Sequence, residues 1–357
     1  MPLGTFRAER FRCLTAVEIE LAPRSNLFVG PNASGKTSLL EAAFFLSRGR
    51  SFRSRRRDAL IAYGCDAFVV TAQTRAEPAA VPLGVRAGRT MIEWRVGGAA
   101  AAGVADLAEL FPAQVIDPEV HKLLEEGPGR RRRYLDWGVF HVEPRFLDNW
   151  RRYHKALRQR NAALKADAAD EVLLVWEKEL AVSGELLAAH RTAYVAQLAS
   201  PLARIGQALI ELPISLVHEP GWDATESLSE ALARDRGRDR RYRATQFGPH
   251  RSDVAVHVGE KPAKDRISRG QQKLVAAALM LAQLEVQEAE RPGRSALLLD
   301  DPAAELDPEN LARLMALVRA VPAQLWVTSV SPHVAQFLDD GRVFHVERGA
   351  IREVRDI

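Results

Sequence analysis

The sequence predicts an α/β domain assembled from both ends of the chain, with a mainly helical domain inserted between them. Near the N-terminus, a short β-prone run is followed by a glycine-rich loop and an amphipathic helix. The middle of the chain shows apolar residues at helical spacing, and alternating strand and helix patterns return towards the C-terminus. We therefore expect residues 1–117 and 244–357 to form one discontinuous domain and residues 118–243 to form the insertion.

In the N-terminal part, the β-prone run spans 26–29 and the helix 37–46. Three short pieces rich in β-branched residues follow at 68–71, 81–86 and 91–96, separated by glycine and proline. This pattern is typical of antiparallel strands, so a mixed sheet with an antiparallel β-subdomain is expected.

In the insertion, Trp150, Tyr153, Leu157 and Leu164 recur at helical spacing, which indicates a helix with one apolar face. The apolar pattern is interrupted at Gly184 and Pro201, so a sustained coiled coil is not expected. One strand is expected at 214–217.

After the insertion, the pattern predicts helices at 269–289 and 308–318. Strands are expected at 296–299, 324–328 and 342–346. These elements complete the α/β domain.

The composition is that of a globular protein: of 357 residues, 47% are hydrophobic and 27% charged. No apolar run is long enough for a membrane span and the N-terminus carries charges, so a cytoplasmic protein without a membrane partner is expected. Cys13 and Cys65 are too few for a disulfide framework, and we expect both to be reduced. The formal charge of +4 permits a polyanionic partner without requiring one.

The glycine-rich loop has the spacing of a P-loop. Phosphate groups are held by backbone N–H groups that converge in a tight loop at a helix N-terminus, and glycines permit the dihedral angles. The lysine then meets the β- and γ-phosphates, and the following hydroxyl ligates Mg²⁺. The predicted ATP-binding residues are Gly30, Pro31, Asn32, Ala33, Ser34, Gly35, Lys36, Thr37 and Ser38.

An acidic element for this site follows the apolar run 297–299, which ends in Asp300 and Asp301. Open parallel sheets place their ligands at the C-terminal ends of the strands. We expect Asp300 and Thr37 to hold the metal, and Asp301 to orient or deprotonate the attacking water, with Lys36 as the second catalytic residue.

Ser268, Arg269, Gly270 and Gln271 begin the predicted helix at 269–289. A serine followed three residues later by glutamine is a capping box, yet a capped helix N-terminus is also an anion site that could face the γ-phosphate of another subunit. Asp307 before Pro308 is similarly an N-cap whose position suits a loop at a subunit interface.

The order of these motifs resembles that of the ATP-binding-cassette ATPases, in which two heads enclose two ATP molecules. The signature of that family normally reads Leu-Ser-Gly-Gly-Gln, and Arg269 replaces its first glycine here. This departure is shared with the RecF branch, and three further stretches are similar to RecF signatures: residues 131–144, 157–165 and 247–253.

The resemblance implies an ATPase head of the cassette type and a bacterial recombination mediator that acts in gap repair, replication restart and the SOS response. It implies ATP and Mg²⁺ as cofactors and weak, DNA-stimulated hydrolysis that works as a switch. The expected partners are DNA (single-stranded and duplex, at gaps and junctions), a second copy of the chain in the presence of ATP, and RecO and RecR in loading RecA. Ser268, Arg269, Gly270 and Gln271 would contact the ATP of the other subunit, and Asp307 would form the D-loop.

DNA contacts are expected from arginine clusters, because guanidinium groups suit phosphate backbones. The candidates are Arg53, Arg55, Arg56, Arg57, Arg131 and Arg132. In a chain so rich in arginine, a solvated face is an equally good interpretation of any one cluster.

Two alternative functions were considered. The ATP-hydrolysing subunit of an ABC transporter would have a glycine in place of Arg269 and a histidine near 326–329, where the sequence reads Trp-Val-Thr-Ser. A small-molecule kinase would need the P-loop but not the helix that begins at Ser268, so ATP-induced dimerisation distinguishes it.

Overall fold

The structure, a computed structural model, describes residues 2–75, 79–265, 267–304, 306–338 and 341–354. It divides into two compact units: Met1–Val120 with Lys273–Ile357, called the head unit here, and His121–Gln272, called the arm unit. The first boundary lies close to the expected 117/118, whereas the second lies at 272/273, after the expected 243/244. The strand at 253–258 pairs with the strand at 214–219, which draws this later segment into the arm unit.

The head unit contains an antiparallel six-stranded sheet in the order β2-β1-β4-β5-β6-β7. Its strands are β1 (Leu3–Phe11), β2 (Leu14–Glu20), β4 (Ala67–Thr74), β5 (Pro82–Gly88), β6 (Ile92–Val96) and β7 (Ala99–Ala100). The three antiparallel strands expected from the sequence are confirmed as β4, β5 and β6. The hairpin β1–β2 was not predicted and supplies the other edge of the sheet.

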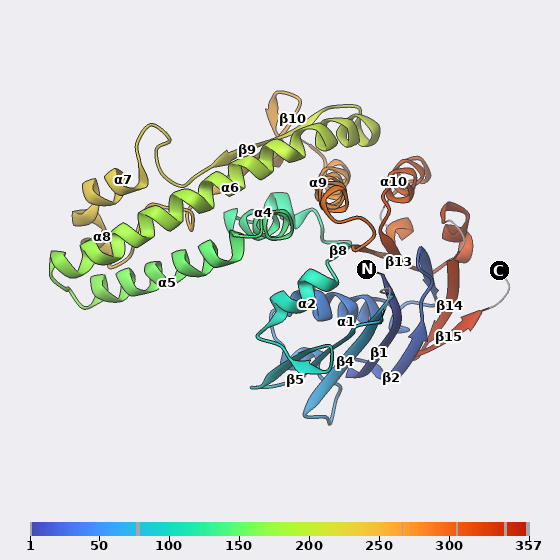
Figure 1. Cartoon of the computed structure of the whole chain (residues 1–357). Helices are drawn as coiled ribbons and strands as arrows, with labels where there is room; N and C mark the ends of the chain where they lie inside the picture. Colours follow the sequence, from blue (N-terminus) through green and yellow to red (C-terminus); the bar gives the residue numbers. More distant parts are fainter. Residues whose placement is uncertain (1, 76–78, 266, 305, 339–340, 355–357) are drawn as a thin grey trace. The chain divides into compact units, whose positions relative to one another are not determined.

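A second six-stranded sheet has the order β15-β14-β3-β13-β12-β8. Its strands are β3 (Ser25–Val29), β8 (Ala113–Ile116), β12 (Ala296–Asp300), β13 (Gln324–Ser329), β14 (Gly341–Glu347) and β15 (Ala350–Val354). All neighbours are parallel except β14 and β15. The strand that leads into the P-loop, β3, therefore lies between two strands from the C-terminal part of the chain (Figure 1).

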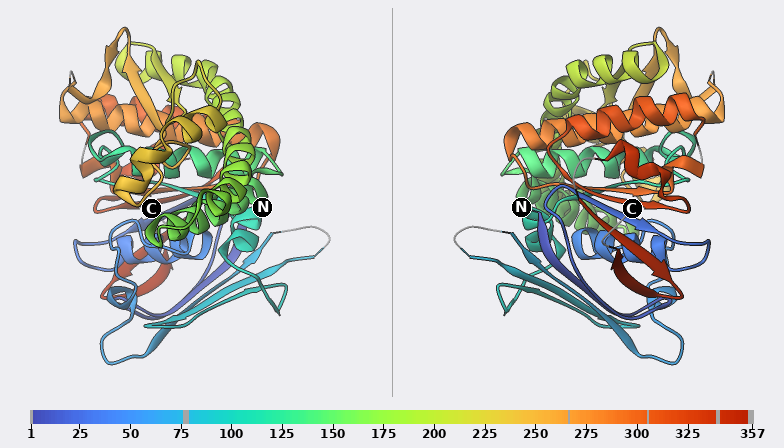
Figure 2. Two further views of the ribbon diagram at one scale, coloured as in Figure 1. Left: turned by 90° about the vertical axis from the view of Figure 1, so that its left-hand side faces the viewer. Right: turned by 90° about the vertical axis from the view of Figure 1, so that its right-hand side faces the viewer.

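Helix α1 (Lys36–Arg48) contacts strands of both sheets. Its apolar residues join one buried cluster with both sheets, in which Phe45 packs edge-on against Phe11 and Phe68, and Phe28 stacks on Phe344. In Figure 2, the antiparallel sheet forms a curved layer on one side of this helix. The remaining helical elements of the head unit are η1 (Asp58–Leu60), α2 (Val104–Leu110), η3 (Pro302–Ala304), α10 (Pro308–Ala320), η4 (Pro332–Phe337) and, from residue 273 onward, α9 (Arg269–Glu290).

The arm unit is built around two long neighbouring helices, α5 (Phe146–Lys165) and α6 (Asp170–Ile210) (Figure 1). Shorter helices are α3 (Lys122–Glu125), α4 (Pro128–Val142), α7 (Leu228–Arg234), α8 (Arg236–Tyr242) and η2 (Ala263–Asp265). A three-stranded sheet in the order β11-β10-β9 consists of β9 (Ile214–Glu219), β10 (Asp253–Val258) and β11 (Lys261–Pro262). The predicted strand at 214–217 is confirmed as β9.

Helix α6 runs without a break through Gly184 and Pro201, where the sequence pattern was interrupted. At Gly184 a β-carbon would lie 2.5 Å from Leu228 Cδ2 and 3.1 Å from the Tyr153 ring, so glycine admits the neighbouring side chains. The glycine thus serves packing against α5 and α7 and does not end the helix.

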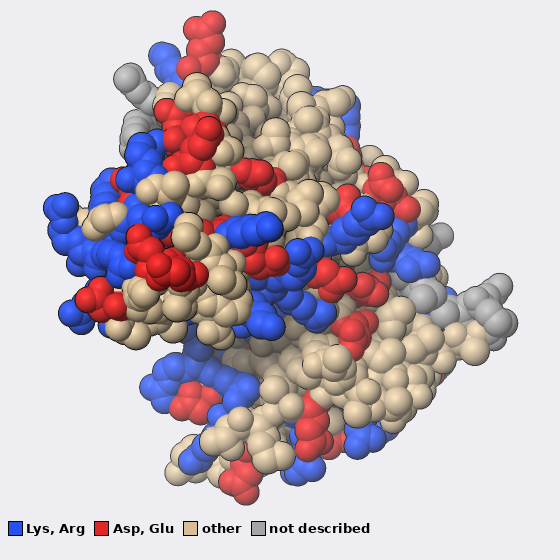
Figure 3. Space-filling view, turned by 60° about the vertical axis from the view of Figure 1, so that its left-hand side comes forward, with Lys and Arg blue, Asp and Glu red and all other residues tan. Residues whose placement is uncertain are grey.

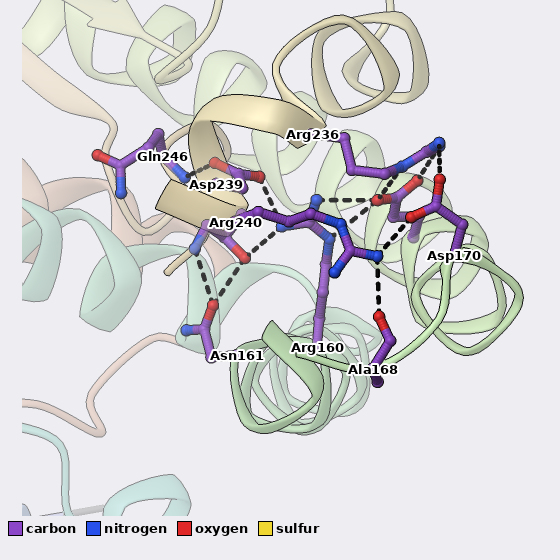
Figure 4. Close-up of polar contacts among 10 residues, drawn as sticks. Arg160, Asn161, Ala168, Asp170, Arg236, Asp239, Arg240 and Gln246 are labelled. Atoms are coloured by element: carbon purple, nitrogen blue, oxygen red, sulfur yellow. Dashed lines mark hydrogen bonds and ion pairs between the residues drawn. The ribbon is translucent and has the colours of Figure 1, made fainter. Parts of the chain in front are cut away.

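A buried ion-pair network joins α5, α6 and α8 (Figure 4). Arg160 has no exposed surface; its Nη1 lies 2.7 Å from Asp239 Oδ2, and its Nη2 lies 2.9 Å from Glu177 Oε1. Arg236 adds a second bond to Glu177, at 2.9 Å. Burial alone would raise the pKa of Glu177, but Arg236 and Arg160 together lower it, so this carboxylate is held in its charged form.

No helix in the described part of the chain is both long and apolar enough to cross a lipid bilayer.

Candidate functional site

The loop between β3 and α1 adopts the conformation that its glycines predict. A β-carbon at Gly30 would lie 2.0 Å from the carbonyl oxygen of Val346, so only glycine fits where the loop leaves the sheet. Gly35 has φ +116°, a conformation that side chains rarely adopt. Ala33 also has a positive φ, of 62°. The loop therefore turns tightly enough to bring successive N–H groups to the N-terminus of α1.

Lys36, the first residue of α1, is 6% exposed. Its Nζ donates hydrogen bonds to Gly30 O at 2.7 Å and Pro31 O at 2.9 Å, which folds the ammonium group back over the loop. Burial lowers the pKa of Lys36, while Asp301 and Asp300 act in the opposite direction. A positive charge thus lies at the place where phosphate groups are expected.

Thr37 and Asp300 meet at this loop although they are far apart in sequence. The Thr37 hydroxyl lies 2.9 Å from Asp300 Oδ1, because β12 ends beside the N-terminus of α1. Thr328, at the end of β13, donates to the same carboxylate oxygen at 2.9 Å. Two strand ends and one helix start therefore converge on a single carboxylate.

Asp300 is 7% exposed, and burial raises its pKa. The hydrogen bonds from Thr37 and Thr328 and the charges of Arg53 and Lys36 oppose that rise. A buried carboxylate next to a hydroxyl is a fitting donor set for Mg²⁺, which takes oxygen ligands and keeps waters and phosphate oxygens in its shell. Among the described residues, no group of three or more His, Cys, Asp or Glu side chains could hold a metal by itself.

Asp301 follows in a left-handed conformation, with φ 48°. Its backbone N–H donates to the Thr328 hydroxyl at 2.9 Å. The single hydroxyl of Thr328 thus contacts both aspartates, one through its carboxylate and the other through its backbone.

The loop is supported by two turns that sequence reasoning missed. Gly349, in the β14–β15 turn, donates its N–H to Ser34 O at 2.7 Å. Arg12, in the β1–β2 turn, pairs with the buried Glu41 of α1, with 2.7 Å between Arg12 Nη2 and Glu41 Oε1. Cys13 is exposed next to this arginine and is a free thiol. Neither turn carries a recognisable motif, and only the strand order reveals them.

The signature residues lie in the arm unit, at the start of α9. Ser268 Oγ accepts from Gln271 N at 3.3 Å, and Gln271 Oε1 accepts from Ser268 N at 3.1 Å, so the predicted capping box is confirmed. Ser268, Arg269, Gly270 and Gln271 are all exposed.

Asp307 caps α10, as its position before Pro308 predicts. Its carboxylate accepts the Asn310 N–H at 2.9 Å, and Pro308 occupies the first turn of the helix. Asp307 itself is exposed.

The arginines proposed for DNA fall into two groups. Arg53 and Arg55 are exposed, whereas Arg56 pairs with Asp58 and Arg57 donates to Arg89 O at 2.9 Å. The charge of Arg53 opposes the rise of the Asp300 pKa that burial causes.

Arg131 and Arg132 form hydrogen bonds within the arm unit. Arg131 makes two bonds of 2.8 Å to Asp253 and one of 2.8 Å to Glu126 O, and Arg132 donates to Ser252 O at 2.5 Å. These contacts favour a structural role for both residues. Basic and acidic side chains are interspersed over much of the surface (Figure 3), so neighbouring positions in sequence do not make a basic patch by themselves.

Residues 2–351 match the family described as "RecF/RecN/SMC N terminal domain". A DNA replication and repair protein RecF from Vibrio vulnificus (strain CMCP6) is 38% identical over 359 residues, covering 99% of this chain and all of the relative. A protein of the same name from Chromohalobacter salexigens is 40% identical over 360 residues, with 98% and 99% of the two chains covered.

Among solved structures, the recombination mediator protein RecF with ATP, in the RecFOR pathway, has a TM-score of 0.89 at 25% identity, with 99% of this chain and 97% of that chain covered. An Smc head domain from Pyrococcus yayanosii has a TM-score of 0.62 at 14% identity, with 99% and 96% covered, which is a likeness of fold alone. The fold expected from the sequence, a cassette-type ATPase head with an inserted helical domain, is confirmed by these likenesses. The chain belongs to the RecF family, within the wider group of RecF, RecN and SMC proteins.

Proposed function

We propose that this protein binds ATP with Mg²⁺ at the loop 30–38 and hydrolyses it slowly, as a switch that controls its assembly on DNA. The observation that carries the proposal is the convergence of Lys36, Thr37 and Asp300, with 2.9 Å between the last two side chains. The solved relative named for its complex with ATP supports the choice of nucleotide.

In this proposal, the backbone N–H groups of the loop and the Lys36 ammonium hold the phosphates, with Ser38 in the first turn of α1. Thr37 and Asp300 would hold Mg²⁺, which supplies positive charge against the phosphate oxygens. Asp301 would orient the attacking water or accept its proton. Its left-handed backbone conformation directs the side chain differently from that of Asp300 one residue earlier.

The second element of the proposal is a homodimer that forms with ATP. Ser268, Arg269, Gly270 and Gln271 present exposed groups at a helix N-terminus, a place that favours anions. The γ-phosphate held by one subunit would meet this helix of the other, and Asp307 would lie at the same interface. Because these residues are already capped within their own chain, they need no rearrangement to serve as a contact surface.

The third element is DNA. We infer a recombination mediator that binds single-stranded and duplex DNA at gaps and junctions, that hydrolyses ATP faster in its presence, and that acts with RecO and RecR to load RecA. The names of the relatives, DNA replication and repair proteins and a mediator of the RecFOR pathway, support this role. The exposed Arg53 and Arg55 remain candidates for contacts with phosphates, whereas Arg131 and Arg132 are weaker ones because of their internal contacts.

The nucleotide switch is tested with Lys36→Ala. We expect this variant to lose the strengthening of DNA binding by ATP, because the phosphates lose their main cation. Lys178→Ala, at an exposed position of α6, is the matched control. The measurement is the affinity for gapped, duplex and single-stranded DNA with and without ATP, and equal ATP-dependent affinities in Lys36→Ala and the parent would contradict the switch.

The dimer is tested with Ser268→Arg. The variant should bind ATP as the parent does but remain monomeric in analytical ultracentrifugation, since only the surface offered to the second subunit changes. Loss of ATP binding by the isolated subunit would instead indicate that Ser268 only caps its own helix.

A further inference from the structure

The outward face of α5 carries mostly basic side chains. The exposed residues recur every three or four positions along this helix and so form one stripe. From position 151 onward they are Arg151, Arg152, Lys155, Arg158, Gln159, Ala162 and Lys165. Five of these seven side chains are cations.

No aspartate or glutamate occurs between Asn149 and Lys165, in a chain with 46 acidic residues. Arg152 is paired with Glu179 at 2.9 Å, and Arg151 lies 3.8 Å from Asp148. Lys155, Arg158 and Lys165 form no ion pair with any residue that the structure describes. We call Arg151, Lys155, Arg158 and Lys165 the α5 basic face.

This arrangement is costly for a helix by itself. Cations four or three residues apart, such as Arg151 with Lys155 and Lys155 with Arg158, repel each other by about 0.2–0.5 kcal/mol per pair. An acidic partner reduces this cost, as Glu179 of α6 does for Arg152 and Asp148 does for Arg151, but Lys155 and Arg158 have no such partner among the described residues. Repulsion between cations that no acidic residue of the chain neutralises is the pattern expected where an anion from another molecule binds.

The buried face of the same helix is fixed in place. Arg160 bonds Glu177 of α6 and Asp239 of α8, and the Asn161 side chain accepts two bonds of 2.8 Å from Thr245 (Figure 4). The residues of segment 157–165 therefore lie on two faces of α5 that have different roles. Its inward residues anchor the helix, and its outward residues Arg158 and Lys165 carry charge.

We propose that the α5 basic face binds the sugar-phosphate backbone of duplex DNA. At about 1.5 Å per residue, Arg151 and Lys165 lie roughly 21 Å apart along the helix, which corresponds to about six phosphates at 3.4 Å per strand. The face offers point charges, and the aromatic residues next to it, Trp150 and His154, are half-buried and pack against each other, so it fits a regular backbone better than a single strand. This inference rests on the proposed DNA-binding function and locates a contact surface that the arginine clusters in the sequence did not indicate.

The test is the double variant Lys155→Ala/Arg158→Ala in the full-length protein. Each lost phosphate contact lowers the dependence of log affinity on log salt by about 0.9. We therefore expect the salt slope for duplex DNA to fall by about 2, and the affinity at 0.1 M salt to fall on the order of 50-fold. Basal ATP hydrolysis and the melting temperature should stay those of the parent.

The matched control is Lys178→Ala/Arg86→Ala, which removes one exposed lysine of α6 and one exposed arginine of β5. It changes the net charge equally, so an equal loss in both double variants would show a general charge effect and overturn the proposal. An unchanged salt slope in Lys155→Ala/Arg158→Ala would overturn it too, as would a loss confined to single-stranded DNA. Loss of RecR binding with DNA affinity retained would assign the face to an acidic protein partner instead. If the parent protein bound no DNA, that result would contradict the proposed DNA-binding function itself, and with it this inference.

Discussion

Replacing Thr328 by valine tests how the two aspartates of the site are held. Valine keeps the shape of the side chain but removes the hydroxyl that lies 2.9 Å from Asp300 Oδ1 and accepts the Asp301 N–H at 2.9 Å. Thr328 is completely buried, so water does not replace the lost partners. The Asp301 N–H would lose its acceptor, and Asp300 Oδ1 would keep only the hydrogen bond from Thr37, in a low-dielectric environment.

The size of the effect follows from those two bonds. A hydrogen bond to a charged group is worth about 1.5–3 kcal/mol, and a buried N–H without a partner costs about 1–3 kcal/mol. Allowing for relaxation, we expect Thr328→Val to lower the free energy of unfolding by about 3 kcal/mol. Thr328→Ser keeps the hydroxyl and loses one buried methyl group, a change of about 1 kcal/mol.

The assay that distinguishes positioning from packing is the Mg²⁺ dependence of ATP hydrolysis. With Asp300 held by Thr37 alone, Thr328→Val should need more Mg²⁺ and have a kcat about 10–100-fold lower, the usual effect of losing a residue that orients a metal ligand. Thr328→Ser should restore both. The reasoning is refuted if Thr328→Val has the kcat and Mg²⁺ requirement of the parent, or if the serine variant is impaired equally.

Three further predictions concern buried ionisable groups. Since burial raises the pKa of Asp300, its carboxylate destabilises the metal-free fold at neutral pH. Asp300→Asn should therefore raise the melting temperature in EDTA, while it lowers the rate of ATP hydrolysis by about 100-fold or more. A melting temperature below that of the parent would contradict this reasoning. Arg160→Met leaves the buried Asp239 carboxylate without a cation and Glu177 with Arg236 alone, and should cost about 3–5 kcal/mol in urea unfolding, against less than about 1 kcal/mol for the surface control Arg152→Met. Burial lowers the pKa of His250 to about 4, so the unfolded chain takes up a proton between pH 6.5 and 4 that the folded chain does not. Stability should therefore fall by about 1.4 kcal/mol per pH unit as the pH decreases through that window, and His250→Gln should remove this part of the slope in unfolding curves at pH 7, 6 and 5.

The conformation of the loop at residues 30–38 was predictable because it is local. The spacing from Gly30 to Thr37 defines a loop and a helix start within eight residues, and the apolar strand before Asp300 indicates a carboxylate at a strand end. Thr328 was not predictable as a partner of Asp300, because its role depends on β13 lying beside β12 in the sheet. The sequence shows two strands but not that they are neighbours.

The arginines illustrate the same limit. Arg131 follows Arg130 and precedes two more arginines, which predicted a basic patch, yet Asp253 neutralises it from a strand more than a hundred residues away. Lys155 and Arg158 are separated in the sequence, and only the helical periodicity places them on one face. Charge clusters along a chain and charge clusters in space coincide only where no distant acidic residue intervenes.

The place of β3 in its sheet has a consequence for how the protein is made. β3 leaves the ribosome early, but both of its neighbours, β13 and β14, lie beyond residue 323. β3 therefore cannot pair with its neighbours until almost the whole chain is synthesised. The arm unit comprises residues 121–272 and can fold before that point. The loop at residues 30–38 therefore gains its supporting strands only after residues 324–347 are synthesised.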